Sequence, residues 1–160
     1  MRRLSLPICL LSLLCLTYGH AQTYAGVAFG LPTFNIHLGF RDAAAAGDLR
    51  VRFSSDLNTD ATIAADFLFD VTAITPDIQA YVGVSPEFRY FENNKNSNTY
   101  LGLGGAGLLG GRWQLSQRWH VFAEGGGALH YGWTVAGVSG NFDRGWFSDG
   151  RASLGVGITF

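Results

Sequence analysis

The chain has 160 residues, a formal net charge of −1, 14% charged residues, 14% aromatic residues and 22 glycines. Such a length allows one domain and hardly two. The absence of any cluster of lysine and arginine excludes a nucleic-acid partner. So little charge beside so much glycine is also unusual for a soluble domain.

Residues 1–21 predict a secretory signal peptide. Arg2 and Arg3 make its start positive, an apolar run follows from Leu4 to Leu16, and Gly19-His20-Ala21 places small residues at the −3 and −1 positions of a cleavage site. The apolar run is short for a transmembrane helix. We therefore expect cleavage after Ala21, with an uncleaved N-terminal anchor as the alternative, and a mature domain over 22–160.

Removal of this segment changes the chemistry of the chain. Both cysteines, Cys9 and Cys15, leave with it, so no disulfide framework is expected. The loss of Arg2 and Arg3 lowers Lys+Arg from 11 to 9 against 12 acidic residues, which gives a net charge of about −3.

Alternation of apolar and polar residues dominates the rest of the chain and predicts strands. In 33–41, Phe34, Ile36, Leu38 and Phe40 share one face. The ranges that we interpret as strands are, in chain order, 23–30, 33–41, 48–54, 63–71, 78–90, 99–111, 118–133 and 151–160. The faces of 99–111 stay undetermined because the range is so rich in glycine. The first three strands are close to the shortest that can cross a bilayer.

The connections carry turn residues and differ in length. In an up-and-down barrel with an even number of strands, successive connections lie at opposite ends. External loops are then expected near Pro32 and at 55–58, 93–98 and 133–149, and periplasmic turns near Ala44, Thr75 and Leu115. The longer and more polar loops fall mostly on one side, as membrane barrels prefer.

The residues of the polar face predict whether the apolar face meets lipid or the core of a soluble protein. A soluble sandwich or lipocalin-like barrel would turn its apolar face inward. Here the polar face is small at many positions, which suits the crowded lumen of an eight-stranded barrel; these are Gly26, Gly39, Gly83, Gly126, Gly155 and Gly157. Aromatic residues would form two girdles near the rims. We therefore predict an all-β, closed, up-and-down antiparallel transmembrane β-barrel of about eight strands, with aromatics in a soluble core as the alternative.

The end of the chain carries a family resemblance. Residues 151–160 end in Phe160, with Leu154, Val156 and Ile158 at alternate positions before it. This run resembles the C-terminal signature of bacterial outer-membrane proteins, and the mature chain as a whole resembles the small OmpA/OmpX-type barrels. The resemblance implies outer-membrane lipid around the barrel and recognition of the terminal strand by the barrel-assembly machinery during insertion. It also implies an outer-membrane location.

Charged residues on the polar face predict an internal network. They are Arg50, Arg52, Asp66, Asp70, Glu87, Arg89, Glu124 and Arg151. Because a buried ion is costly unless it is paired, we expect salt bridges that close the lumen. A narrow, gated ion path is the alternative, whereas a wide channel does not fit inside eight strands.

The longest predicted loop is rich in aromatic residues, namely Trp133, Phe142, Trp146 and Phe147. Exposed aromatic side chains can mark a binding surface, which makes a surface ligand at the external loops a further expected partner. The alternative is that these residues belong to strands extended beyond the membrane and carry the outer girdle.

Other chemistry is not supported by spacing. Residues 102–107 match G-x-G-x-x-G, but inside a strand with no helix after it, so we expect no dinucleotide cofactor. His120 and His130 are about 33 Å apart along an extended strand and cannot share a metal ion. We expect no enzyme activity and no cofactor. The leading hypothesis is a structural or surface-interaction barrel of the cell envelope; a soluble barrel binding an apolar ligand and a small-solute channel are the alternatives.

Overall fold

The computed structural model describes residues 22–31, 33–42, 46–93, 98–136 and 144–160, and within them the chain is a succession of strands. Predicted signal residues 1–21 lie outside the described residues, as do Pro32 and Ala44. The strands are β1 Gln22–Leu31, β2 Phe34–Asp42, β3 Gly47–Ser55, β4 Asp60–Thr75, β5 Ile78–Asn93, β6 Asn98–Gln114, β7 Trp119–Ala136 and β8 Arg144–Thr159.

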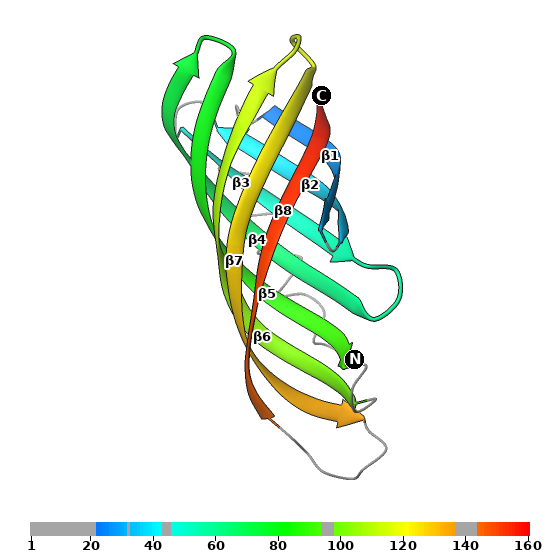
Figure 1. Ribbon diagram of the computed structural model, residues 1–160. Helices are drawn as coiled ribbons and strands as arrows, with labels where there is room; N and C mark the ends of the chain where they lie inside the picture. Colours follow the sequence, from blue (N-terminus) through cyan, green and yellow to red (C-terminus); the bar gives the residue numbers. More distant parts are fainter. Residues whose placement is uncertain (1–21, 32, 43–45, 94–97, 137–143) are drawn as a thin grey trace, which may run out of the picture.

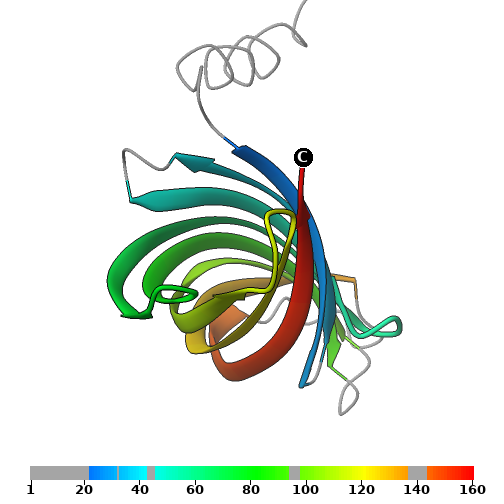
Figure 2. The same ribbon diagram turned by 90° about the horizontal axis from the view of Figure 1, so that it is seen from above.

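All eight strands belong to one closed sheet (Figures 1 and 2). Each strand pairs antiparallel with the next along the chain, and β1 pairs with β8 to close the ring, with Val27 opposite Val156. The barrel therefore has two ends. We call the end with Gln22 and Thr159 the terminal end, and the opposite end, with the connections β1–β2, β3–β4, β5–β6 and β7–β8, the loop end. The predicted closed, up-and-down topology is confirmed.

The strands are strongly tilted. A line of paired residues that starts at Thr23 passes once round the sheet through Phe40, Leu49, Phe67, Val84, Gly107, Gly127 and Gly150. Leu31 on β1 lies opposite Ala152 on β8. If this pairing is extended by two residues, Gly150 is level with position 33, which is ten residues beyond Thr23, where the line began. This stagger corresponds to a tilt of about 40° from the barrel axis.

The wall of the barrel has two heights. Strands β1, β2 and β3 have 10, 9 and 9 residues, whereas β4 to β8 have 16 to 18. With about 3.3 Å per residue and this tilt, the short strands rise about 23 Å and the long ones about 40 Å. The stagger places the terminal ends of β1 and β8 at the same height. The difference in height between the short and the long strands therefore lies mainly at the loop end. The first three strands, predicted to be close to the shortest that can cross a bilayer, are the short ones, and the wall is low there.

Several strands are longer than the sequence predicts. β4 continues to Thr75, β5 to Asn93 and β7 to Ala136, and β8 already begins at Arg144. The described residues of the predicted loop at 133–149 are therefore strand. Gly145, Ser148 and Asp149 resemble loop residues in the sequence, but each is held by a partner on β7, as in the pairs Gly132 with Gly145 and Leu129 with Ser148.

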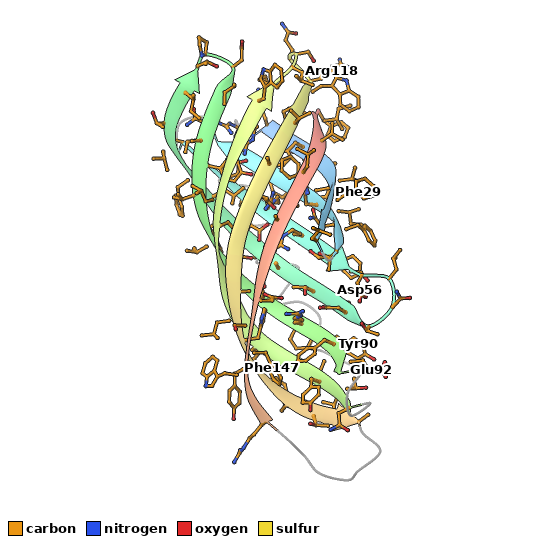
Figure 3. The ribbon with its side chains drawn as sticks, viewed as in Figure 1. Phe29, Asp56, Tyr90, Glu92, Arg118 and Phe147 are labelled. Carbon is orange, nitrogen blue, oxygen red and sulfur yellow. The ribbon has the colours of Figure 1, made fainter. Side chains whose placement is uncertain are left out.

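The apolar face of the sheet points outward and the charged face points inward. Phe29 and Leu154 are 74% and 65% exposed, whereas Arg50 is 2% exposed and Asp66 is fully buried. Phe53 is likewise exposed on the outer face (Figure 3 labels Phe29 beside β1). A soluble barrel with a dry apolar centre would show the reverse, so the predicted facing is the one observed. Within the described residues, no helix is long and apolar enough to cross a membrane.

Small lumen-facing residues make room for large ones on the neighbouring strands. A Cβ at Gly39 would overlap the ring of Tyr24, and a Cβ at Gly157 would overlap the ring of His120. Side chains from all strands share the narrow lumen. A glycine next to an aromatic ring therefore leaves space for that ring across the barrel. These positions were predicted from glycine on the polar face alone.

The β3–β4 turn is organised by Asp56. Its carboxylate accepts backbone N–H bonds from Asn58, Thr59 and Asp60 at 2.8–2.9 Å and the Thr59 hydroxyl at 2.8 Å. Burial raises the pKa of Asp56, but these donors together outweigh burial and lower the pKa to about 2. Leu57, the next residue, has a φ of 69°, which is unusual for a residue other than glycine.

We expect Asp56→Ala to lower the free energy of unfolding by about 0.5–1 kcal/mol near neutral pH, since an exposed turn loses these hydrogen bonds to water. The folded-state pKa lies below the unfolded value of about 3.9. The stabilisation is therefore complete above that value and is lost as the pH falls toward 2. Urea unfolding at several pH values should show the gap between wild type and variant closing across this interval. A gap that persists at the acidic end would contradict the assignment.

Candidate functional site: the charge-paired lumen

The centre of the lumen holds two arginines around one carboxylate. Arg50 Nε donates to Asp66 Oδ2 at 2.7 Å, and Arg52 donates to both Asp66 oxygens at 3.0 and 3.1 Å. Ser85 Oγ donates to Asp66 Oδ1 at 2.5 Å. All four side chains come from neighbouring strands β3, β4 and β5, and all are buried. Asp66 is thus the acceptor on which both cations converge.

Two glutamates connect this centre to the far wall. Arg50 Nη2 donates to both oxygens of Glu124 on β7, at 2.9 and 3.1 Å. Arg52 Nη2 donates to Glu87 at 2.8 Å, and Arg151 on β8 donates to both oxygens of Glu87 at 2.5 and 2.7 Å. The central network therefore crosses the whole lumen. Its three arginines are matched by three carboxylates.

Hydroxyl and imidazole groups complete the coordination of the two glutamates. The Tyr81 hydroxyl donates to Glu124 at 3.0 Å, and Ser153 donates to its other oxygen at 3.3 Å. His130 Nε2 lies 3.0 Å from Glu87 Oε2. Because each buried carboxylate has several partners, little of its desolvation cost is left uncompensated.

A second cluster lies nearer the terminal end. Arg41 Nη2 donates to Asp70 at 2.5 Å and Arg41 Nη1 to Asp48 at 3.3 Å. Arg112 also pairs with Asp48, which accepts the hydroxyl of Tyr24 at 3.0 Å. This terminal cluster has two cations and two anions.

A third cluster lies nearer the loop end. Arg89 pairs with Asp60 on β4 and with Asp149 on β8. The guanidinium also lies 5.3 Å from the ring centroid of Phe91. One cation faces two anions here, so this outer cluster has an excess of negative charge.

Aromatic rings close the spaces on either side of the charges. Toward the loop end, Phe91 stacks on Tyr100 with centroids 5.1 Å apart, and Phe147 meets both rings edge-on. Toward the terminal end, His37 packs edge-on against Tyr24 and Phe122. Neither ring nitrogen of His37 has a hydrogen-bond partner among the described residues.

The cavities along the barrel reflect this layering. A cavity of about 690 Å³ at the terminal end is lined by residues that include Arg41, Arg112 and His120. A smaller cavity of about 40 Å³, enough for one or two water molecules, lies between the central and outer groups beside Arg52 and Arg89.

The structure brings six of the eight predicted charged residues into one connected network. These are Arg50, Arg52, Asp66, Glu87, Glu124 and Arg151. Arg89 belongs to the outer cluster and Asp70 to the terminal cluster, because the tilt of the strands places them at other levels. The expectation of one network is thus replaced by three groups.

Sequence reasoning missed several partners. Asp149 fell in a predicted loop, Asp60 lay between a predicted loop and the next predicted strand, and Arg112 came just after a predicted strand end. None of them was therefore counted as facing the lumen. Asp48 and Arg41 were on the polar faces of predicted strands. Counting every charge on those faces would have found these two.

The predicted surface-loop aromatics that the structure describes lie on strands. Trp133 is on β7, and Trp146 and Phe147 are on β8, so the interpretation as extended strands is the correct one. Trp146 is exposed on the outer face and meets Tyr131 edge-on, whereas Phe147 faces the lumen. Period-two alternation places these neighbouring residues on opposite faces. Phe142 lies outside the described residues.

The C-terminal run is part of the outer wall. Leu154 and Phe160 are exposed, and Val156 and Ile158 are half-buried on the same face. Ile158 lies between Ala25 on β1 and Trp119 on β7, so the run forms the closing seam of the barrel.

Groupings typical of catalysis do not occur in the described part of the chain. Ser85 and Ser153 donate to carboxylates, and His130 is paired with Glu87. No group of three or more histidine, cysteine, aspartate or glutamate residues among those described could hold a metal ion. What the arrangement does chemically is to hold charges fixed in place.

Comparisons with known proteins agree with this geometry at the level of the fold. No protein-family model matches the sequence, and no curated protein matches it significantly. The structure is similar to the N-terminal β-barrel domain of Pseudomonas aeruginosa OprF, with a TM-score of 0.58 and 13% identity over 88% of this chain and 96% of that one. It is also similar to Neisserial surface protein A (NspA), with a TM-score of 0.50 and 18% identity over 88% and 94%. The predicted resemblance to small OmpA/OmpX-type barrels is confirmed for the fold.

Proposed function

We propose, from a fold shared with small outer-membrane barrels, that this chain spans the bacterial outer membrane and has a structural or surface-interaction role in the cell envelope. The single observation that carries the proposal is the inversion of the sheet, with apolar side chains outside and a balanced charge network inside. An apolar face that points outward is favourable in hydrocarbon and unfavourable in water. The paired charges then close the lumen.

The route to the membrane follows from two further features. Residues 1–21 have the pattern of a cleaved signal peptide, which would export the chain. The outward run Leu154, Val156, Ile158 and Phe160 would then be read by the barrel-assembly machinery during insertion, as the family resemblance implies. Outer-membrane lipid is the lasting partner of this face. Neither a catalytic role nor a cofactor is part of the proposal.

We expect the full-length mature protein to give a flat current trace in planar lipid bilayers at high protein loading. The physical reason is that ions would have to displace Arg50 and Arg52 from buried carboxylates, which is costly. Stepwise conductance of the wild type would instead favour the narrow-channel alternative.

A neutral double variant, Arg50→Ala with Glu124→Ala, provides the positive control for that measurement. It removes one cation and one anion that span the lumen, while Asp66 keeps Arg52. We expect small conductance steps from this variant under the conditions in which the wild type is silent. Heat-modifiable migration in detergent gels would verify that both proteins are folded barrels.

Detergent fractionation tests the membrane location itself. The mature protein should partition with the detergent phase, because residues such as Phe29 and Leu154 leave a continuous apolar outer surface. Recovery in the aqueous phase would overturn the proposal and restore the soluble barrel.

A further inference from the structure

Among the residues that the structure describes, half of β8 has a strand on one side only. β8 pairs with β7 from Arg144 to Ile158, but with β1 only from Ala152 to Thr159, because β1 ends at Leu31. Residues 144–151 therefore form an open edge at the loop end. Figure 1 shows this half of β8 with β7 on one side and no strand on the other.

The backbone groups of this edge point into the open side. The Phe160 N–H donates to Thr23 on β1, and the Thr159 N–H donates to Arg118, which precedes β7. Along a strand without a bulge this alternation continues, so Trp146, Ser148 and Gly150 aim N–H and C=O away from β7. No strand of the described residues pairs with these three. Unpaired edges of this kind bind added strands.

The inner face beside the edge is accessible. The side chain of Asp149 is 31% exposed, whereas its counterparts Asp66 and Glu87 in the central network are fully buried. Phe147 and Arg151, which share its face, are also only half-buried. An added strand would therefore find room for side chains on the lumen side as well as beside Trp146 on the outside.

The outer cluster beside the opening has an excess of negative charge. Arg89 is outnumbered in the outer cluster by Asp60 and Asp149. On the β4 side, Asp56 organises the turn and the Glu92 N–H bonds to Thr59 there, which brings a further carboxylate to this rim (Figure 3). A basic partner is the complementary one.

We propose that residues 144–151 of β8 receive an extended basic peptide as an added strand. Main-chain hydrogen bonds to Trp146, Ser148 and Gly150 give the affinity, and alternate lysine or arginine side chains face the outer cluster. The inference rests on the proposed surface role, since it names the class of partner.

A second copy of this chain is a poorer occupant. Two copies inserted in the same direction are related by an axis along the membrane normal. Their β8 strands, each tilted by about 40°, would then cross at about 80° and could not form a ladder. A free peptide has no such restriction.

The test uses a fluorescent octapeptide of alternating lysine and valine, with the folded mature barrel in maltoside micelles and anisotropy as the readout. Saturable binding is expected. Two control peptides have the same sequence and charge, but every second backbone amide is N-methylated, at the odd positions in one and at the even positions in the other. Each control therefore lacks the N–H donors along one of its two edges. We expect one of the two N-methylated forms to lose binding. No binding of the parent peptide, or equal binding of all three, would overturn the proposal.

Two variants at one position locate the site. Ser148→Pro removes an N–H that points to the open side and leaves the β7 ladder intact, whereas Ser148→Ala removes only the hydroxyl. We expect binding to weaken at least about fivefold in the proline variant and to stay unchanged in the alanine variant. Equal affinities would show that the peptide is held by charge alone and would refute the strand. Because conductance does not involve this edge, a failed peptide test leaves the closed lumen standing.

Discussion

Replacing Asp66 with asparagine should lower the free energy of unfolding by about 3–5 kcal/mol, the largest loss expected from any single isosteric change in this chain. Asp66 is fully buried and accepts bonds from Arg50, Arg52 and Ser85. An amide in its place leaves the lumen with an uncompensated positive charge far from water. Reversible urea unfolding in lipid vesicles, followed by tryptophan fluorescence, would measure the loss.

Asp70→Asn is the matched control for this change. Asp70 pairs with Arg41, and both side chains are partly exposed near the terminal end. Water can therefore compensate the lost pair, and we expect a cost of about 1 kcal/mol or less. Adding Arg52→Gln to Asp66→Asn should recover part of the loss because the charge balance is restored. Equal costs for the two asparagine variants would show that the central network is not desolvated.

Leu154→Arg should destabilise the membrane-inserted barrel by about 2–4 kcal/mol. Leu154 lies on the outer face opposite Phe29 and Ala123, well inside the apolar band. An arginine there must place its guanidinium in hydrocarbon or bend toward the interface. The measurement is again urea unfolding in vesicles, with the heat-modified gel shift as a test of folding.

Ser153→Arg, one residue away, tests the facing of the sheet. Ser153 faces the lumen and already donates to Glu124, so a cation there has an acceptor within reach. We expect a smaller loss than for Leu154→Arg, even though the lumen is narrow. The opposite order would mean that the apolar face does not meet lipid.

The period-two pattern correctly predicted the eight strands and their order. It also predicted the inward position of Arg50, Asp66 and Glu124. A shift of one residue would turn every charge on a strand toward lipid, so the pattern determines the facing strongly. The short length of β1–β3 could also be predicted, because turn residues bound the alternating runs of these strands closely.

The grouping of charges could not be obtained in this way. Which residues meet across the lumen depends on the stagger between strands, and that stagger is a property of the closed ring. Arg89 and Asp149, for example, are 60 positions apart and come together only because β5 and β8 are tilted past one another. Strand ends were also missed, because cross-strand partners hold Gly145 and Ser148 in positions where turn residues suggest a loop.

The two wall heights bear on the lipid as much as on the protein. A bilayer of uniform thickness cannot match both a side about 23 Å tall and a side about 40 Å tall. In the proposed membrane-spanning state the taller side would extend beyond the hydrocarbon, whereas beside β1–β3 the acyl chains would have to shorten to match the lower apolar surface around Phe29, Leu38 and Phe53. Each ångström of such mismatch costs a fraction of a kcal/mol. The inserted barrel should therefore compress the lipid along one flank and gather wherever the membrane is already thin.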